Sequence, residues 1–138
     1  MASIPHSEII AHGNRTGKII RGAILEAALV WHDLLLAFVT DDIPQEDTLR
    51  IYLLDQRFNV IDTATLSGMY STGSFRELTL TPPDTLNFRF IGDVVWTLRL
   101  LPGVIFKLPM LTDPPGVHRP LSCYRRFTLA GNPKPELV

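Results

Sequence analysis

The chain has 138 residues, of which 46% are hydrophobic, with 11 prolines, one cysteine and a net charge of −1. This length fits a single domain, and the apolar fraction is too high for a disordered chain. The composition excludes collagen-like proteins, disulfide scaffolds and zinc ribbons, because one thiol, Cys123, can neither close an internal disulfide nor supply several metal ligands. We therefore expect one globular domain over residues 1–138, held together by packing, with a buried thiol.

The residue types favour strands over helices. Val, Ile and Thr far outnumber Lys, Glu and Gln. β-branched side chains fit a pleated, half-buried surface, whereas long polar side chains populate exposed helix faces. The sequence therefore predicts an all-β protein.

The N-terminal part of the chain allows two readings. Residues 1–17 mix short apolar stretches with turn residues and are expected to form an N-terminal arm. Residues 19–39 are mostly apolar. In the first reading, the segments Ile24–Trp31 and Leu34–Thr40 are strands that form a hairpin. In the second, a helix lies within residues 19–39 and the protein is α+β. Periodicity alone does not separate the two readings. The neighbouring strands favour the hairpin.

The central part of the chain shows clearer strand signals. Thr48–Leu53 alternates polar and apolar residues with period two, as a half-buried strand does. Turn residues then separate further strand segments. The segments expected to be strands are Val60–Leu66, Phe75–Thr81 and Leu86–Ile91.

The hairpin centred on Pro83 can be given a register from its side chains. Apolar pairs fall on one face and polar or charged pairs on the other in a single register. The expected pairs are Leu80 with Leu86, Leu78 with Phe88, Glu77 with Arg89 and Thr79 with Asn87. The next hairpin is expected to pair Phe90, Phe88 and Leu86 with Val94, Trp96 and Leu98.

The C-terminal part is rich in proline. A type II turn is expected at Pro102-Gly103. The remaining segments are expected to be strands Val94–Leu101, Val104–Leu108 and Tyr124–Ala130, a proline-rich loop over residues 109–120 and a tail over residues 131–138. In total we expect seven to nine short antiparallel strands in a small β-sandwich or β-barrel.

The sequence argues against secretion and against a membrane span. The first residues lack the charged and apolar regions of a secretory signal. Residues 22–39 are long and apolar, but they include Glu26, His32 and Asp33, and an acid at bilayer depth costs about 2.5 to 3.5 kcal/mol. We expect a cytoplasmic protein.

Sequence motifs for catalysis or metal binding are not found. The four histidines stand at none of the spacings that place two ligands on one metal. Neither a GxSxG elbow nor a glycine-rich phosphate loop occurs in the sequence. The acidic residues Asp41, Asp42, Glu46 and Asp47 lack the pattern of an EF-hand loop, and Ser71–Ser74 fits a solvated turn better than an anion-binding nest. We expect no metal and no cofactor.

Charge is divided unevenly along the chain. Acidic residues outnumber basic ones in residues 1–69, and the reverse holds in residues 70–138. Basic residues gather around the last expected strand and predict a small-anion or ligand site at His118, Arg119, Arg125 and Arg126. The alternative is that these arginines face solvent or pair with the acidic half. A pI near 6.4 argues against nucleic-acid binding.

Two functional hypotheses follow. The first is a non-enzymatic binding or self-assembly module, a homo-oligomer that associates through exposed edge strands and opposite charges. The second is a β-barrel that binds a small apolar or anionic ligand, with enzymatic activity at its mouth as an option. Its interior would be lined by Phe88, Phe90, Trp96, Leu98 and Phe106.

Overall fold

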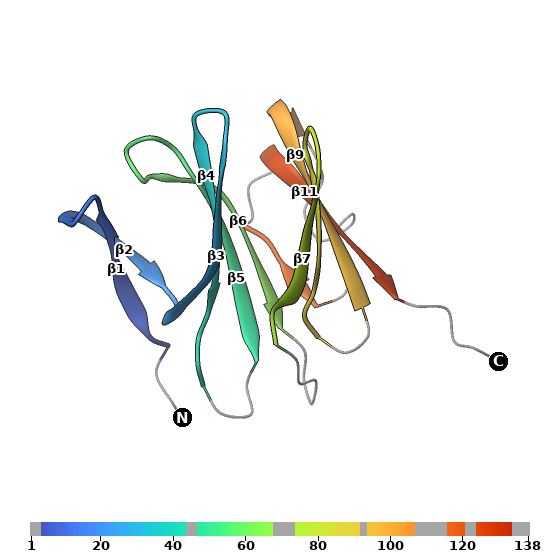
Figure 1. Cartoon of the computed structure of the whole chain (residues 1–138), viewed down its shortest axis with the longest axis horizontal. Helices are drawn as coiled ribbons and strands as arrows, with labels where there is room; N and C mark the ends of the chain where they lie inside the picture. The colour runs from blue at the N-terminus through green and yellow to red at the C-terminus, as the bar shows by residue number, and fades with distance from the viewer. Residues whose placement is uncertain are drawn as a thin grey trace.

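The computed structural model describes residues 4–43, 47–67, 74–91, 94–106, 116–120 and 124–133. Within these residues the chain forms eleven strands in three antiparallel sheets (Figure 1). The strands are β1 (His6–Ala11), β2 (Asn14–Arg21), β3 (Ile24–Trp31), β4 (Leu34–Thr40), β5 (Thr48–Leu54), β6 (Val60–Ser67), β7 (Arg76–Thr81), β8 (Thr85–Arg89), β9 (Val94–Phe106), β10 (Val117–His118) and β11 (Tyr124–Pro133).

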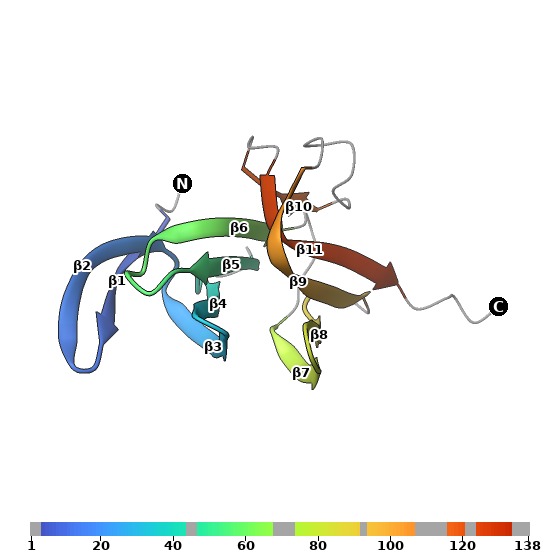
Figure 2. The ribbon, with the colours of Figure 1, turned by 90° about the horizontal axis from the view of Figure 1, so that it is seen from above.

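The two larger sheets form a sandwich, and the smallest sheet is a hairpin beside it. The order is β10-β6-β5-β4-β3 in one sheet and β11-β9-β8-β7 in the other, and among the described strands β1 and β2 pair only with each other. Seen from above, the β1–β2 hairpin lies on the side of the five-stranded sheet away from the four-stranded sheet (Figure 2). The all-β, sandwich-like architecture predicted from the composition is confirmed.

The main core lies between the two larger sheets. Its side chains come from alternate positions of strands in both sheets, as period-two patterning requires. Phe38 on β4 packs against Phe88 on β8, with ring centroids 5.3 Å apart, and both rings contact Phe75. Aromatic contacts therefore join the two sheets near the middle of the sandwich.

A second, smaller core lies on the other face of the five-stranded sheet. Ala37, Val39, Tyr52 and Leu54 are buried there, with Ile9 and Ile20 of the hairpin packed against them. β4 is therefore apolar on both of its faces, because each face is covered, one by the four-stranded sheet and the other by the hairpin.

The hairpin reading of residues 19–39 is confirmed, with the expected strand ends, and the helical alternative is wrong. β3 and β4 pair antiparallel from Trp31 with Leu34 to Ile24 with Thr40. His32 takes a positive φ of 54° at the turn between them. The pairing of β4 with β5 fixes this segment as strands, a choice between hairpin and helix that periodicity left open.

The predicted register is largely confirmed around β8. Leu86 pairs with Leu98 and Phe88 with Trp96, as expected. In the preceding hairpin Leu80 pairs with Leu86 and Thr79 with Asn87. The expected pairing of Glu77 with Arg89 is wrong, because the register shifts between Arg76 and Thr79 and Arg76 lies opposite Arg89. Glu77 nevertheless forms an ion pair with Arg89.

The expected turn at Pro102-Gly103 is wrong, because β9 runs as one strand through both residues. On β11, Phe127 pairs with Leu100 and Arg125 with Ile105, so the intervening residues of β9 form an irregularity in the ladder. A bulge accommodates a proline that a regular central strand would exclude.

Other boundaries also differ from expectation. The arm over residues 1–17 contains β1 and the start of β2, and β10 lies inside the expected proline-rich loop, so the described residues hold more than seven to nine strands. β11 extends to Pro133, into the expected tail. Residues 109–115 and 134–138 lie outside the described residues.

The β-barrel alternative is wrong, because none of the three sheets closes on itself. Of the aromatic and aliphatic residues expected to line a barrel, Phe88, Phe90, Trp96 and Leu98 are buried in the sandwich core. Membrane-spanning helices were also sought in the described residues, and no helix there has the length and apolarity to span a bilayer.

Candidate functional site

The basic residues predicted as an anion site make contacts within the fold, two of them at Asp62. Arg119 is buried and forms an ion pair with Asp62 on β6, with Nη2 2.7 Å from Oδ2 and both side chains no more than 3% exposed. The Arg119 guanidinium also donates to the carbonyl oxygen of Thr63 and lies 4.2 Å from the ring centroid of Phe127. Arg119 thus pairs with a carboxylate from the acidic half of the chain.

Asp62 joins three segments of the sandwich. Its carboxylate accepts hydrogen bonds from the backbone N–H groups of Thr63 and Arg126, both at 2.8 Å, in addition to the Arg119 contact. These bonds connect β6, the residue after β10, and β11. A buried carboxylate with this many donors is a structural cross-link, since each bond satisfies a charge removed from water.

The other predicted site residues are Arg125, His118 and Arg126, whose side chains lie in different environments. Arg125 is buried and donates to the carbonyl oxygens of Tyr124 and Pro120. His118 is exposed and pairs with Thr65 in the β-ladder. Arg126 lies with Tyr124 at a hollow of about 270 Å³ beside Val60. Of the four residues, Arg119 and the backbone of Arg126 therefore meet at Asp62, while His118 and Arg125 make other contacts.

Two further candidates from the sequence were the acidic stretch and the small polar turn. Asp41 is buried and forms an ion pair with Arg50, with Nε 2.8 Å from Oδ1, which raises the pKa of the Arg50 guanidinium. In the described ranges no group of three or more His, Cys, Asp or Glu side chains could hold a metal ion. Glu46, residues 71–73 and Cys123 lie outside the described residues.

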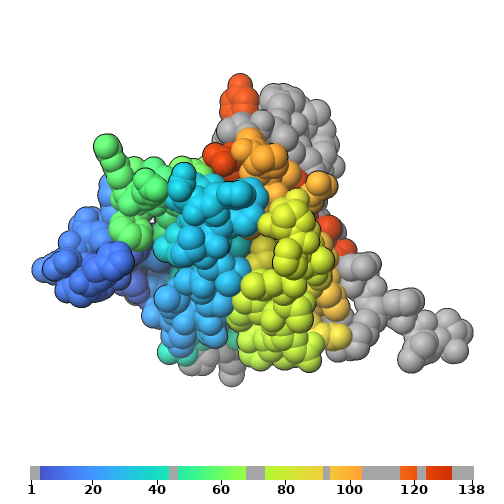
Figure 3. Space-filling model, turned by 45° about the horizontal axis from the view of Figure 1, so that its top comes forward, coloured from blue at the N-terminus to red at the C-terminus, as the bar shows by residue number. Residues whose placement is uncertain are grey.

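The candidate functional site is an apolar groove between the β1–β2 hairpin and the outer face of the five-stranded sheet, which we name the hairpin groove. Its volume is about 700 Å³. In the space-filling view the hairpin stands at one side of the β3–β4 surface, with the β5–β6 turn above it (Figure 3). The floor is formed by outward-facing residues of β3, β4 and β5: Leu25, Ala28, Val30, Leu35, Ala37, Val39 and Leu54.

The floor is incompletely covered at β3. Leu25 is 62% exposed and Val30 is 79% exposed, although both are large aliphatic residues. Ile9 and Ile20 of the hairpin pack over β4 and β5, and do not extend the same cover to β3. The groove exists because a two-stranded hairpin is narrower than the sheet it covers.

Hydrogen bonds fix the base of the hairpin. The Gly22 N–H donates to the Pro5 carbonyl oxygen at 2.8 Å, which closes the hairpin, and the Tyr52 hydroxyl donates to the Arg21 carbonyl oxygen at 2.7 Å, which joins the hairpin to β5. Gly22 has a φ of +121°, and a Cβ atom there would lie 2.3 Å from Cγ1 of Val39. Only glycine fits this close approach in this conformation, so the groove depends on it.

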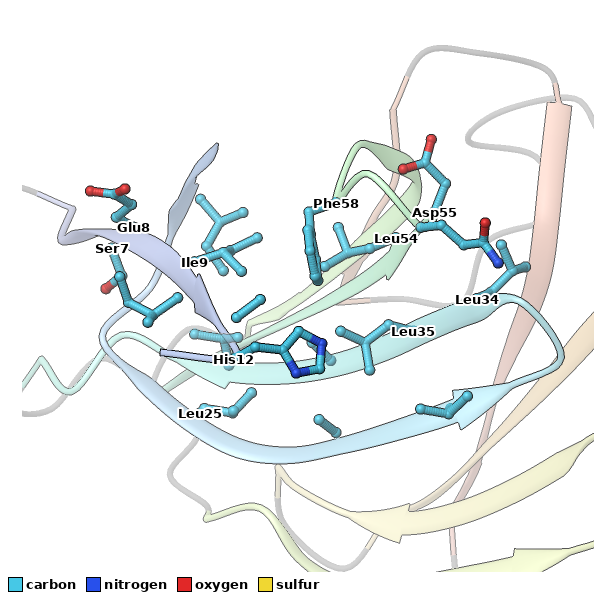
Figure 4. Close-up of a pocket in the computed structure, with 18 of the residues that line it drawn as sticks. Ser7, Glu8, Ile9, His12, Leu25, Leu34, Leu35, Leu54, Asp55 and Phe58 are labelled. Carbon is cyan, nitrogen blue, oxygen red and sulfur yellow. The ribbon is translucent and has the colours of Figure 1, made fainter. Parts of the chain in front are cut away.

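The β5–β6 turn closes one end of the groove. Asp55 Oδ1 accepts hydrogen bonds from the backbone N–H groups of Arg57 and Asn59, which lowers the pKa of the Asp55 carboxyl. This turn places Phe58 at a φ of 63°, and its ring points toward Leu35 on the floor (Figure 4). A bulky residue in the left-handed region is strained by about 1 to 3 kcal/mol, and such strain is common at ligand-binding sites.

Polar groups lie around the rim of the groove. Glu8 forms a bidentate ion pair with Arg15, which lowers the pKa of the Glu8 carboxyl. His12 and His32, at the tips of two hairpins, also line the groove and share positive φ values of 53° and 54°. An apolar floor with few polar groups at its edge is the usual form of a ligand site.

Sequence reasoning missed this groove, although one signal was available. Leu34–Val39 is apolar at every position, so β4 needed a cover on both faces, which the sandwich alone does not provide. The second cover had to come from the N-terminal arm. How much of the sheet that arm leaves open depends on three-dimensional packing.

Comparison with models of protein families, with curated protein sequences and with solved structures finds no match for this chain.

Proposed function

We propose that the protein is a non-enzymatic binding module and that the hairpin groove holds a small, single-chain apolar ligand. The observation that carries this proposal is the groove itself, an apolar space of about 700 Å³ within the range of ordinary ligand pockets. Its position differs from the barrel interior expected from the sequence, since it lies on the outer face of the five-stranded sheet.

The groove has apolar surface left for a ligand to cover. Leu25, Val30 and Ile10 line it and are each more than half exposed. Full burial of such a side chain contributes about 1.5 to 3 kcal/mol, so covering part of three of them favours binding of an apolar chain, whose own surface is buried at the same time.

The walls of the groove are already in place. The hairpin is anchored to β5 by the hydrogen bond from Tyr52 to Arg21, and the β5–β6 turn is fixed by Asp55. Lys18 on β2 also donates to Asn59 Oδ1 at 2.8 Å, which joins the hairpin to this turn. A ligand therefore enters without ordering a loop, and less of its binding energy is lost to conformational entropy.

A neutral fluorescent dye such as Nile red tests the proposal by titration. The Ala28→Trp variant places a large ring on the groove floor, while Thr79→Trp places the same ring on the exposed edge strand β7 as a control. We expect the dye to bind the unchanged protein and the Thr79→Trp variant equally, and the Ala28→Trp variant at least about tenfold more weakly. Equal binding to all three, or none to any, would contradict the proposal.

Self-assembly remains the second candidate, on a different observation. β3 is an edge strand of eight residues that pairs only with β4 in the described part of the chain, and it contains one charged residue, Glu26. Long apolar edge strands pair with other strands, so a second copy could add to the sheet at β3 and give a homo-oligomer.

Sedimentation velocity over a range of protein concentrations distinguishes this candidate. We expect a concentration-dependent dimer that Val30→Lys converts to a monomer, because a lysine on an edge strand opposes strand pairing. The Thr79→Lys variant, on β7 of the other sheet, serves as the control and should leave the dimer intact. A monomer at every concentration would exclude self-assembly through β3.

A further inference from the structure

The ionisable side chains that line the hairpin groove are acidic or histidine. Glu8, Asp33 and Asp55 line it together with His12 and His32, and the described lining includes neither lysine nor arginine. The charge of Glu8 is offset by Arg15, whose Nη2 lies 2.7 Å from Oε1. The remaining negative charge is therefore contributed by Asp33 and Asp55.

Both aspartates lie at the same end of the groove. Leu35 pairs with Leu54 in the antiparallel β4–β5 ladder, so the chain before β4 and the chain after β5 lie at the same end of the sheet. Asp33 immediately precedes β4, in the β3–β4 turn, and Asp55 immediately follows β5, in the β5–β6 turn. The groove thus has an apolar floor and one acidic end.

We propose that the ligand of the hairpin groove is a monomeric amphiphile with a cationic ammonium head and an apolar chain. The chain lies over the floor residues of β3 and β4, and the head lies at the rim near Asp33 and Asp55. This inference rests on the proposed binding function and adds the charge of the ligand to it.

Two features of the acidic end support a cationic head. The hydrogen bonds from Asn59 and Arg57 keep the pKa of Asp55 low, so its carboxylate stays charged at neutral and mildly acidic pH. Phe58 lies at the same end of the groove, with its ring toward the floor and the Asp55 carboxylate pointing away from it (Figure 4), and the face of an aromatic ring attracts ammonium groups. Negative charge at this end and an aromatic face together favour an alkylammonium over a carboxylate of the same chain length.

Basic side chains near this end lie outside the groove lining. Lys18 donates from Nζ to Asn59 Oδ1, and Arg57 is exposed on the β5–β6 turn. Lys18 interacts electrostatically with the Asp55 carboxylate, so it weakens the negative field at this end of the groove, especially at low salt. The expected charge preference is therefore modest.

The test is isothermal titration calorimetry with three ligands that share one apolar chain and differ in the head. Decyltrimethylammonium, decanol and decanoate are each used below their micelle or solubility limits. We expect decyltrimethylammonium to bind about five- to tenfold more tightly than decanol, and decanoate to bind more weakly than decanol.

Three variants test which side chains cause the preference for the cationic head. Asp33→Asn should reduce the advantage of decyltrimethylammonium over decanol about two- to fivefold. Phe58→Leu should reduce the advantage to a similar extent and leave decanol binding almost unchanged, because leucine keeps the apolar contact and removes the aromatic face. Asp42→Asn removes the same charge at an exposed position outside the groove and should change neither value.

The outcomes separate the two proposals. If decanol binds and all three heads bind equally, or if decanoate binds best, the cationic ligand is excluded while the binding function stands. If Asp42→Asn lowers the preference as much as Asp33→Asn does, the effect comes from net charge and the rim site is excluded. If none of the three ligands binds, the proposed binding function itself fails.

Discussion

The two faces of β4 carry similar apolar side chains but are buried to different extents. On the inner face, Leu36 and Phe38 are fully buried against the four-stranded sheet. On the outer face, Leu35 is only half-buried and lines the hairpin groove, although it adjoins Leu36 in sequence. The difference comes from the covering element, because a four-stranded sheet closes the inner face and a two-stranded hairpin covers the outer face in part.

This contrast separates stability from binding within one strand. A filled interface contributes stability in proportion to the apolar area removed from water, and it has no space for a ligand. A partly covered face contributes less stability and keeps apolar surface available. We therefore expect inner-face changes to affect unfolding and outer-face changes to affect ligand binding.

The largest expected effect comes from the inner face. Phe38→Ala should lower the free energy of unfolding by about 4 kcal/mol, because it removes ring contacts with Phe75 and Phe88 and leaves a cavity. The matched outer-face change Leu35→Ala should cost about 1 kcal/mol. Urea denaturation measures both, and equal losses would show that the two faces do not differ as described.

The next largest effect is expected at the Asp62 cross-link, which lies on the face of the five-stranded sheet that is turned toward the four-stranded sheet. Asp62→Ala should lower the free energy of unfolding by about 3 kcal/mol, since it leaves the buried Arg119 charge without this carboxylate. Thermal unfolding followed by circular dichroism checks the loss. An unchanged midpoint would mean that this ion pair is not a structural cross-link.

A smaller effect is expected at the hinge of the hairpin. Gly22→Ala should destabilise the protein by about 2 kcal/mol, because a Cβ atom at 2.3 Å from Val39 Cγ1 forces the hairpin away from the sheet. Hydrogen exchange should become faster in β1 and β2 and stay unchanged in β8. Uniformly faster exchange would indicate that the hairpin and the sandwich unfold together.

The smallest effect concerns pH. The pKa of Asp55 is lowered in the folded protein by hydrogen bonds from the β5–β6 turn, led by the Asn59 N–H. Its contribution to stability is thus present above the pKa of the unfolded chain and is lost as pH falls through the lowered folded value. Asp55→Asn should be less stable than the unchanged protein at pH 7, and this difference should shrink below about pH 4. A difference that stays constant over this range would contradict the role of the Asp55 charge.

The sequence predicts much of the sandwich because its signals are local. Period-two alternation predicts β5, and facing pairs such as Phe88 with Trp96 follow from a short turn. Bulges are where this reasoning fails. The register shift before Thr79 and the irregularity at Pro102 each add residues to one strand only, and alternation alone does not reveal them.

The candidate site could not be predicted because it depends on contacts between distant segments. Arg119 belongs to a basic cluster in the sequence, but its partner Asp62 lies 57 residues away and is visible only after folding. The groove likewise forms between residues near the N-terminus and the β5–β6 turn. The sequence pattern does not distinguish Val30 from a buried strand residue, because its exposure follows from the width of the hairpin that covers the sheet.

The most direct test of binding at the outer face is a nuclear magnetic resonance titration of the isotope-labelled protein with decyltrimethylammonium. We expect the largest amide shift changes at Ala28, Leu35 and Phe58 around the groove, with little change at Phe88 and Leu98 in the sandwich core. Changes centred on β9 and β11, or no saturable changes at all, would contradict this expectation.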